Sequence, residues 1–546
     1  MPINETIKTL SDIGWTGDAS DQGRDCIAFT EREQEAQEKV KELAGALQQK
    51  AQEKGLNLEI QEDPFGNVYV TLQGRSEQRI LMCSHIDSVP HGGRYDGIAG
   101  IAGGLEVLEK IIDAGIVPQK TIQVASFRAE ESSKTGMSCL GSSLAAGLLT
   151  IEDLQRIKHE VFGKDMLKIL MERGLSTEEI DTSIRTPYIR GEKLDAVMEL
   201  HVEQSGVLES LNHPLGVVIN GIGGALRRKI KVGEIGEKVQ IPGHLKPIRI
   251  SIKGTASHSG GTPMNGEMIA AKNMAIRRDA LAAMARILSR IPVKYLTKLD
   301  VPGGSFNVVP GECVAEIYTL RAYLPKIHEI MDDYLLTGME GTVEVIERPT
   351  PEEEIISGIR EEVVDAAMSV ITETERVAED IAIRTRGLVR ATVGNAIIEE
   401  DETIILHMDE RRLDNAEGDR LNTALNERFR DISEKQKVPV QEVESGEDRR
   451  KISLATPFEN DEIQRVIRGV HTEMFGKNPP AFGSMPGHDA AKMCRSDKTG
   501  RAVPTGMIFV RGQNHGISHN PSEYSTPKDL EMGSKLLHEV VKRLAF

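Results

Sequence analysis

The first third of the chain alternates short apolar runs with segments of helical periodicity. Two apolar runs, RILMCS at 79–84 and KTIQVASF at 120–127, have the length of buried strands, and the segment 98–115 between them has the spacing of a helix. Further apolar runs of the same kind lie at 194–200 (LDAVMEL) and 505–510 (TGMIFV). Buried strands interleaved with helices predict a mainly parallel, doubly wound α/β sheet.

The pattern changes in the middle of the chain. Strands whose polarity alternates, such as 247–254, are accompanied by one-sided helices such as 279–291 and by a charged helical stretch from Pro351 to Arg384. These features favour a smaller α+β domain that is inserted into the first domain. We therefore predict a catalytic α/β domain in two parts and an inserted α+β domain, with the boundaries 1–221, 222–450 (inserted) and 451–546.

The charge balance excludes some classes of partner. The 67 Lys and Arg residues against 84 Asp and Glu residues give a net charge of −17, so neither nucleic acid nor an anionic membrane is expected as a partner. The N-terminus has no basic segment followed by an apolar block, and no run of eighteen apolar residues occurs, so we expect a cytoplasmic protein. The five cysteines are far apart and form no CxxC pair, which fits reduced thiols better than a disulfide framework or a structural zinc site.

Polar side chains follow each of the predicted buried strands. In chain order they are His85, Asp87, Asp96, Glu130, Glu131, His201, Gln204 and His519. Because ligands of open α/β sheets bind beyond the carboxyl ends of the strands, we expect these side chains to converge.

The residue types in this set are those of a metal centre. Imidazoles and carboxylates are the ligands that zinc, manganese or cobalt accept, and two ions about 3.5 to 4 Å apart can share one carboxylate, for which Asp96 is the natural bridge. Asp87, two positions after His85, is predicted to accept the second N–H of that imidazole. If the preceding strand continues, Glu130 and Glu131 point opposite ways, so we assign Glu131 to a metal and Glu130 to proton transfer as the catalytic base.

A series of motifs occurs in the order seen in one family of hydrolases. The motifs are SHIDSV (84–89), GGRYDG (92–97), the Glu130–Glu131 pair followed by CLGSSLAAG (139–147), LHVEQ (200–204), GTASHSGGTPM (254–264) with RRDAL (277–281), FNVVPG (306–311), GHDA (487–490) and GISHNPSE (516–523). By these motifs the chain resembles the amidase, hydantoinase and carbamoylase family, which includes N-carbamoyl-L-amino acid hydrolases, β-ureidopropionases and allantoate amidohydrolases. It is similar more widely to the dinuclear-metal aminoacylases and carboxypeptidases. LHVEQ is the most discriminating motif, because related peptidases carry a carboxylate at the position of His201.

The resemblance implies a site for two divalent metal ions, with zinc expected first and manganese, cobalt or nickel as alternatives. One ion would be held by His85, Asp96 and His201, and the other would be held by Asp96, Glu131 and His519. The inserted domain would be the lid and dimerisation domain of a homodimer. Its His258 would reach an active site, either that of its own subunit or that of the partner.

The resemblance also implies a group that binds a carboxylate of the substrate. Gln204, Asn307 and an arginine would form this group, since a guanidinium can grip a carboxylate with two hydrogen bonds. Arg411 in MDER follows an aspartate, as in the family's Asp-x-Arg, whereas Arg321 in TLRA lies at the right distance from Asn307 but lacks that aspartate. Arg411 is preferred because the helix and strand predicted after it match those of the family, and Arg321 remains the alternative.

The chain departs from the family pattern at several positions. Ser205 replaces a glycine, Gly261 replaces a threonine, and Met485 with Pro486 replaces smaller residues. The inserted domain is also longer than in most relatives. These departures leave the side chain of the substrate undefined.

Together these features predict a metal-dependent hydrolase that acts on linear amides. Its expected substrate is an N-carbamoyl-L-amino acid, cleaved at the ureido C–N bond, or a related small ureido or amide molecule that carries a carboxylate. Two alternatives stay open, namely an N-acyl amino acid deacylase or dipeptidase on the same fold and a non-catalytic binding protein. The intact set of metal ligands argues against the second alternative.

Overall fold

The computed structural model describes most of the chain, as two compact units. The described residues are 2–16, 22–234, 241–242, 244–265, 268–269, 273–274, 277–304, 308–346, 358–399, 401–443, 452–453, 455–458 and 461–546. Unit 1 comprises Met1–Gly223 and Ala455–Phe546, and unit 2 comprises Gly224–Leu454.

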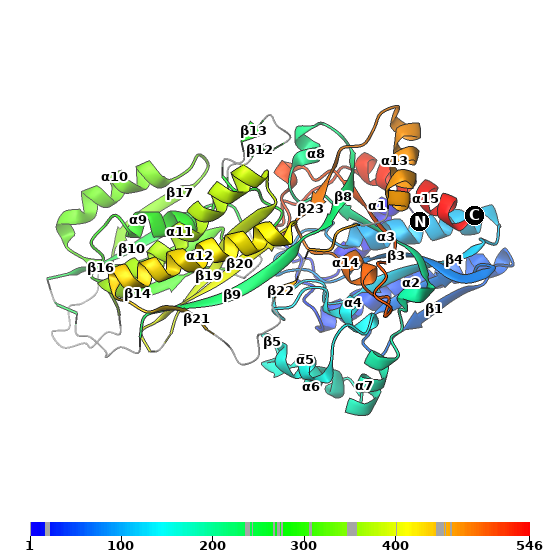
Figure 1. Ribbon diagram of the computed structural model, residues 1–546, viewed down its shortest axis with the longest axis horizontal. Coiled ribbons are helices and arrows are strands. Elements are labelled where there is room, and N and C mark those ends of the chain that lie inside the picture. Colours follow the sequence, from blue (N-terminus) through cyan, green and yellow to red (C-terminus); the bar gives the residue numbers. More distant parts are fainter. Residues whose placement is uncertain are drawn as a thin grey trace. The chain divides into compact units, whose positions relative to one another are not determined.

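Unit 1 is built on a mixed sheet of eight strands (Figure 1). In spatial order these are β1 (Leu58–Glu62), β2 (Val68–Leu72), β4 (Lys120–Phe127), β3 (Ser76–His85), β7 (Leu194–Val202), β24 (Thr505–Val510), β8 (Leu215–Ile222) and β23 (Ala481–Ser484). The central strands β4, β3, β7 and β24 run parallel to one another, while β1, β2 and β8 pair antiparallel with their inner neighbours. The segments that follow β3, β4, β7 and β24 therefore start at the same edge of the sheet.

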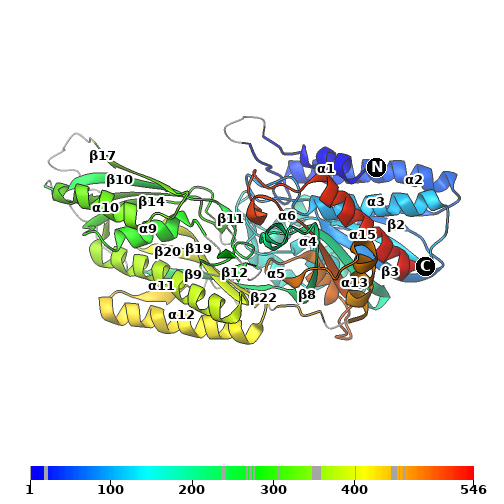
Figure 2. The same ribbon diagram turned by 90° about the horizontal axis from the view of Figure 1, so that it is seen from above.

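Helices cover both faces of this sheet. Alternate residues of β3 point to opposite sides, so that Ile80 and Met82 belong to one apolar core and Leu81 and Cys83 belong to another. The first core is closed by α1 (Ile3–Ser11), α2 (Glu31–Glu53), α3 (Ile98–Ala114), α13 (Asp461–Phe475) and α15 (Pro527–Ala545), and the second by α4 (Leu140–Ala145) and α14 (Asp489–Cys494). Figure 2 shows α1, α3 and α15 packed beside one another.

A third, smaller cluster of apolar residues in unit 1 lies under a run of short elements. These elements are α5 (Ile151–Arg156), β5 (Lys158–His159), β6 (Lys164–Asp165), α6 (Met166–Glu172) and α7 (Thr177–Arg185). The short helix α8 (Val207–Ser210) follows β7.

Two glycines let helix α3 begin against the strand ends. Gly97 has a φ of 70°, and a Cβ there would lie 2.5 Å from the carbonyl oxygen of His85. A Cβ at Gly100 would lie 2.5 Å from the carbonyl oxygen of Leu200 in β7. Only residues without a side chain permit this approach, which places Asp96, directly before Gly97, beside the end of β3.

Unit 2 contains two antiparallel sheets that share one apolar core. The first consists of β17 (Glu340–Val345), β10 (Lys246–Lys253), β16 (Glu312–Thr319), β14 (Tyr295–Asp300) and β18 (Ile359–Arg360), and the second of β19 (Val389–Ile398), β20 (Ile404–Arg412), β9 (Gly224–Val232), β21 (Val440–Glu442) and β22 (Ile452–Ser453). Two short ladders pair β11 (Ser257–His258) with β15 (Val308–Val309) and β12 (Met268–Ile269) with β13 (Asn273–Met274). The helices are α9 (Ala280–Leu288), α10 (Leu324–Tyr334), α11 (Glu361–Thr385) and α12 (Asn415–Gln436), and Figure 1 shows α11 and α12 side by side.

The predicted α/β architecture with a large, mainly parallel sheet is confirmed. Within its described residues, from Gly358 onward, the stretch predicted to be helical from Pro351 to Arg384 is helical from Glu361. The two residues before it form β18, which pairs with β14, and residues 351–357 lie outside the described part of the chain. No described helix is both long enough and apolar enough to cross a bilayer.

Two buried histidines, His213 and His471, stack in unit 1 with ring centroids 5.2 Å apart. His213 Nδ1 lies 2.8 Å from the carbonyl oxygen of Leu215, and His471 Nδ1 lies 3.1 Å from that of Lys477. Burial lowers the pKa of both rings, that of His471 to about 4. Both rings are therefore neutral in the folded protein at neutral pH.

The stability of unit 1 should decrease as the pH is lowered, because His471 is buried as a neutral ring. Its pKa is about 6.5 in an unfolded chain and about 4 in the folded protein, so this contribution to stability is present above pH 6.5 and is lost as the pH falls from 6.5 towards 4. We expect the urea midpoint to drop less between pH 7 and pH 5 in His471→Gln than in the wild type. The single tryptophan, Trp15, lies in unit 1 and provides the fluorescence signal. His515→Gln, at an exposed ring, is the control, and an equal drop in all three proteins would contradict the assignment.

Candidate metal centre and active site

His85 and His201 present the same ring nitrogen to Asp96. The Nδ1 atom of His85 lies 3.2 Å from the carbonyl oxygen of Asp87, and that of His201 lies 3.0 Å from the carbonyl oxygen of Val202. A carbonyl only accepts hydrogen bonds, so in the neutral rings each Nδ1 carries the proton and each Nε2 carries a lone pair. The two Nε2 atoms lie 3.4 and 3.1 Å from Asp96 Oδ1. These three side chains form one group that could hold a metal ion.

A second group of this kind forms on the other oxygen of Asp96. His519 Nε2 lies 3.0 Å from Glu131 Oε1 and 3.5 Å from Asp96 Oδ2. Asp96 therefore faces one potential metal-binding group with each of its carboxylate oxygens.

The spacing and the chemistry of these atoms fit divalent cations. In a tetrahedral site with bonds of about 2.0 to 2.2 Å, neighbouring ligand atoms lie about 3.3 to 3.6 Å apart. The distances between ring nitrogens and carboxylate oxygens are 3.0, 3.1, 3.4 and 3.5 Å. Nitrogen and carboxylate ligands without a thiolate suit zinc, manganese or cobalt. The five side chains could therefore hold two divalent ions that share Asp96.

Without a bound cation, protons on His85 and His201 balance the negative charge of Asp96 and the carboxylates near it. Burial alone would lower the pKa of His201, but its contact with Asp96 raises the pKa to about 9. Burial is likewise outweighed at His85, whose pKa is raised well above the ordinary value by Asp87 and Asp96. The same contacts hold the pKa of Asp96 well below its ordinary value, although burial opposes this. A cation that binds here must displace protons from these rings.

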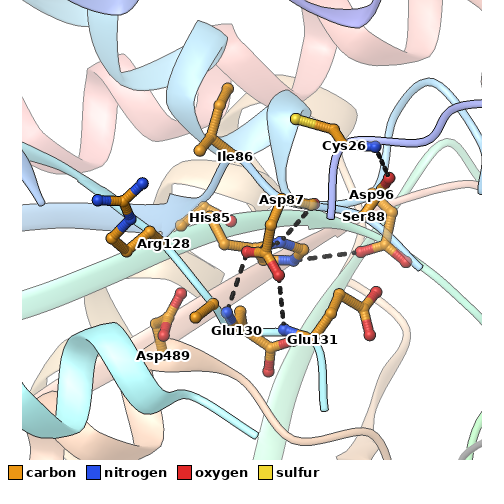
Figure 3. A network of polar contacts seen from close by, with 12 residues as sticks. Cys26, His85, Ile86, Asp87, Ser88, Asp96, Arg128, Glu130, Glu131 and Asp489 are labelled. Atoms are coloured by element: carbon orange, nitrogen blue, oxygen red, sulfur yellow. Dashed lines mark hydrogen bonds and ion pairs between the residues drawn. The ribbon is translucent and has the colours of Figure 1, made fainter. Parts of the chain in front are cut away.

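Asp87 contacts both His85 and the Glu130–Glu131 pair (Figure 3). Its main-chain oxygen makes the shorter contact to His85 Nδ1, whereas its carboxylate, the predicted partner, lies 3.5 Å from that atom. The carboxylate accepts the backbone N–H groups of Glu130 and Glu131 instead, each at 3.0 Å. The strand does not continue to the Glu130–Glu131 pair, because β4 ends at Phe127 and Ala129, with a φ of 53°, turns the chain. This turn presents the two N–H groups to Asp87.

Glu130 is buried and contacts Cys139 twice. The Cys139 thiol donates to Glu130 Oε1 with an Sγ–Oε1 distance of 3.0 Å, and the Cys139 N–H donates to the Glu130 carbonyl at 2.8 Å. Burial raises the pKa of Glu130 to about 7, an effect that His85 opposes and Glu131 reinforces. A carboxyl with this pKa can take up and return a proton near neutral pH. Nothing in the sequence indicated this contact, although Cys139 opens the motif CLGSSLAAG that follows the Glu130–Glu131 pair.

Gln204, predicted to bind substrate, contacts Asp96. Its Nε2 donates to Asp96 Oδ2 at 2.8 Å and to Ser518 Oγ at 2.9 Å. Ser518 Oγ lies 2.6 Å from the same Asp96 oxygen and 2.8 Å from Glu523 Oε2. Glu523 Oε1 also accepts the backbone N–H groups of Tyr95 and Asp96, and burial raises the pKa of Glu523 to about 7. Glu523, the last residue of GISHNPSE, thus holds the loop of Asp96 and was missed by the sequence reasoning.

Two more buried acids lie close to these residues. Glu199 accepts hydrogen bonds from the hydroxyl of Ser84 and the N–H of Ala490, and Asp489 accepts one from the hydroxyl of Ser142. Burial raises the pKa of both, and the charges of Glu130 and Glu199 raise that of Asp489 further. Glu199 lies inside a strand and Asp489 at a helix start, so neither stood out as a site residue in the sequence.

The remaining predicted residues lie in unit 2. His258 Nδ1 accepts the N–H groups of Gly260 at 3.0 Å and Gly261 at 2.8 Å, so its ring proton is on Nε2. Arg411 is buried, and its Nε donates to Asp409 Oδ2 at 2.6 Å. A Cβ at Gly260 would lie 3.1 Å from His258 Cε1 and 3.3 Å from Arg411 Cγ, so Gly260 separates these two side chains.

Of the two other carboxylate-binding residues predicted in this unit, the structure describes only Arg321. Arg321 is exposed in a 3-10 turn before α10. Asn307 lies outside the described residues.

Comparison with known proteins identifies the family of the chain. The model of the peptidase family M20/M25/M40 matches residues 81–543. An N-carbamoyl-L-amino acid amidohydrolase of Geobacillus stearothermophilus is 25% identical over 98% of this chain and 97% of its own length, and the allantoate amidohydrolase of Bacillus subtilis is 23% identical over 100% and 97%. A hydantoinase/carbamoylase family amidase from Burkholderia vietnamiensis has the same fold, with a TM-score of 0.60 at 20% identity over 100% of this chain and 96% of that one. The resemblance expected from the motifs is thereby confirmed, and the chain belongs to peptidase family M20/M25/M40, whose members hydrolyse amide bonds.

Proposed function

We propose that the protein is a dinuclear metal-dependent amidohydrolase that cleaves the ureido C–N bond of N-carbamoyl-L-amino acids or of a closely related ureido substrate. The observation that carries the proposal is the placement of Asp96 between two sets of metal-ligating atoms, with the buried carboxyl of Glu130 close by. Membership of the family supports hydrolysis of an amide-type bond. The names of the relatives support a ureido substrate.

His85, Asp96 and His201 would hold one ion, and Asp96, Glu131 and His519 would hold the other. Divalent ions supply a lowered pKa for water and polarise a carbonyl group. Zinc is proposed first. The same ligand set also accepts manganese, cobalt or nickel.

Glu130 is assigned the proton transfers. Its carboxylate takes a proton from the attacking water and returns it to the departing nitrogen, a role that suits a pKa of about 7. Water adds to the ureido carbonyl, the bond to the amino acid nitrogen breaks, and the carbamate that leaves decomposes. The products are an L-amino acid, carbon dioxide and ammonia.

The proposal assigns substrate contacts to residues of unit 2. His258 carries its proton on Nε2 and would donate a hydrogen bond to the carbonyl oxygen, where a well-placed donor contributes roughly 3 to 4 kcal/mol. Arg411, with Asn307, would bind the carboxylate of the substrate. Its burial beside Gly260 and its bond to Asp409 favour it over the exposed Arg321.

Three further parts of the proposal concern assembly and location. Unit 2 would serve as the lid and dimerisation domain that the motifs imply. The protein would be a homodimer, and it would act in the cytoplasm.

The substrate class can be tested on one panel. Metal-reconstituted protein is assayed on the N-carbamoyl, N-formyl and N-acetyl derivatives of several L-amino acids and on dipeptides. We expect the highest kcat/KM on an N-carbamoyl derivative, with release of ammonia. A preference for acetyl derivatives or dipeptides would replace the ureido substrate by the deacylase or dipeptidase alternative. Inactivity on every compound by a protein that holds two ions would contradict the proposal.

Glu130→Gln should lower kcat by about 10²- to 10⁴-fold, because general acid–base catalysis contributes about that much. The metal content, measured by elemental analysis, should stay at the wild-type value, since Glu130 is not an assigned ligand. Turnover close to the wild-type rate at full metal content would refute the assignment of the base.

Single ligand substitutions should remove ions in a defined pattern. We expect about two ions per chain in the wild type, about one in His201→Ala or His519→Ala, and fewer than one in Asp96→Ala, because Asp96 belongs to both groups. Equilibrium dialysis with Co²⁺ followed by elemental analysis measures this. His515→Ala, at an exposed ring, should keep the wild-type content. Equal losses in all three ligand variants would contradict two separate groups on one aspartate.

A further inference from the structure

The turn that carries Glu130 and Glu131 is held by side chains from distant parts of unit 1. Its four consecutive N–H groups, from Arg128 to Glu131, are each accepted by a buried side-chain oxygen. The acceptors are Asn67 Oδ1 at 3.1 Å, Glu33 Oε1 at 3.1 Å, Asp87 Oδ1 at 3.0 Å and Asp87 Oδ2 at 3.0 Å.

The carbonyl groups of the same turn are also hydrogen-bonded, in this case by backbone N–H groups. The oxygens of Arg128, Ala129 and Glu130 accept the N–H groups at the start of α4, which belong to Gly141, Leu140 and Cys139 at 3.2, 2.9 and 2.8 Å. A Cβ at Gly141 would lie 2.2 Å from the Arg128 oxygen, so this approach requires a glycine. The backbone that carries the proposed base and a proposed metal ligand is therefore bonded on both sides.

Glu33 and Arg128 form a fully buried ion pair within this arrangement. Arg128 Nε and Nη2 donate to Glu33 Oε2 at 3.0 and 2.6 Å, and Arg128 Nη1 donates to the carbonyl of Phe65 at 3.3 Å. Both side chains are about 1% exposed or less. A Cβ at Gly66 would lie 2.1 Å from Arg128 Nη1, so the chain around the guanidinium leaves no spare space.

A buried ion pair is a poor source of stability by itself. The cost of removing both charges from water often equals or exceeds the attraction between them, and apolar residues of similar volume then stabilise the fold as well or better. What apolar residues cannot reproduce is the bond from Ala129 N–H to Glu33 Oε1, which holds a residue with a φ of 53° directly before Glu130. Burial raises the pKa of Glu33, an effect that the guanidinium opposes, and the hydrogen bonds from the guanidinium orient Glu33 for that bond.

We infer that Glu33 and Arg128 are positioning residues for the Glu130–Glu131 turn. Neither residue is assigned a contact with substrate or metal. The pair fixes the backbone conformation from which Glu131 reaches His519 and Glu130 lies beside His85. This role rests on the proposed function, because it concerns the placement of the proposed base and ligand.

The test separates positioning from stability by replacing the pair with apolar residues. In the Glu33→Met, Arg128→Met double variant we expect a cooperative urea transition, followed by Trp15 fluorescence, with a somewhat lower midpoint, because the buried N–H groups of Phe29 and Ala129 lose their acceptor. Hydrogen exchange of residues 128–131, measured on the metal-free protein by mass spectrometry, should be at least tenfold faster. Affinity for the more weakly bound Co²⁺ ion should fall by about 10- to 100-fold, as for other groups that orient metal ligands, and kcat should fall more than KM.

The matched control is another buried pair, Arg228 and Glu410 of unit 2, whose Nη1–Oε1 distance is 3.0 Å. The Arg228→Met, Glu410→Met variant should keep wild-type exchange at 128–131 and wild-type Co²⁺ affinity. Wild-type exchange and affinity in the Glu33/Arg128 double variant would overturn the inference. If that variant does not fold, Glu33→Gln decides instead, because faster exchange of Ala129 supports the inference and unchanged exchange overturns it. A wild type that binds no Co²⁺ would refute the proposed function, while the exchange measurement would still judge the role of the pair.

Discussion

Repulsion between buried carboxylates is the constraint on which the arrangement of unit 1 depends. Asp87, Asp96, Glu130, Glu131 and Glu523 are each at least about nine-tenths buried, and unpaired charges in such surroundings are costly. Three features of the structure reduce the cost of these buried charges. Backbone N–H groups point at Asp87 and Glu523, raised pKa values keep Glu130 and Glu523 partly protonated near neutral pH, and three histidines face Asp96. Divalent cations would neutralise these carboxylates more fully, because each brings two positive charges to the point where the carboxylate oxygens converge.

The backbone also decides what each histidine can do. At His85 and His201, carbonyl groups occupy Nδ1, and Nε2 is left as an electron-pair donor that suits a metal ion. At His258, two N–H groups occupy Nδ1, and Nε2 is left as a proton donor that suits a developing negative charge. One residue type thus takes two opposite roles, according to whether carbonyl or amide groups of the main chain face its other nitrogen.

The potential ligands were predictable because their positions follow from strand topology. His85 and His201 come at the ends of apolar runs that could hardly be anything but buried parallel strands, and the ends of such strands meet at one edge. The bonds of Asp87 to the Glu130–Glu131 turn were not predictable, because the strand stops at Phe127 and Ala129 adopts a positive φ that alanine rarely takes. The contact of Glu33 with this turn could not be predicted either. Nothing in a charged helical sequence marks one glutamate as buried against a turn almost a hundred residues away.

The place of β24 in the sheet of unit 1 has a consequence for biosynthesis. This strand, residues 505–510, lies between β7 and β8, although the whole of unit 2 separates it from them along the chain. A nascent polypeptide therefore exposes the facing edges of β7 and β8 until nearly all of it has left the ribosome, and contacts of such sequence separation form slowly. His519 emerges later still. The group of Asp96, Glu131 and His519, which could hold a metal ion, is therefore complete only when synthesis is nearly finished.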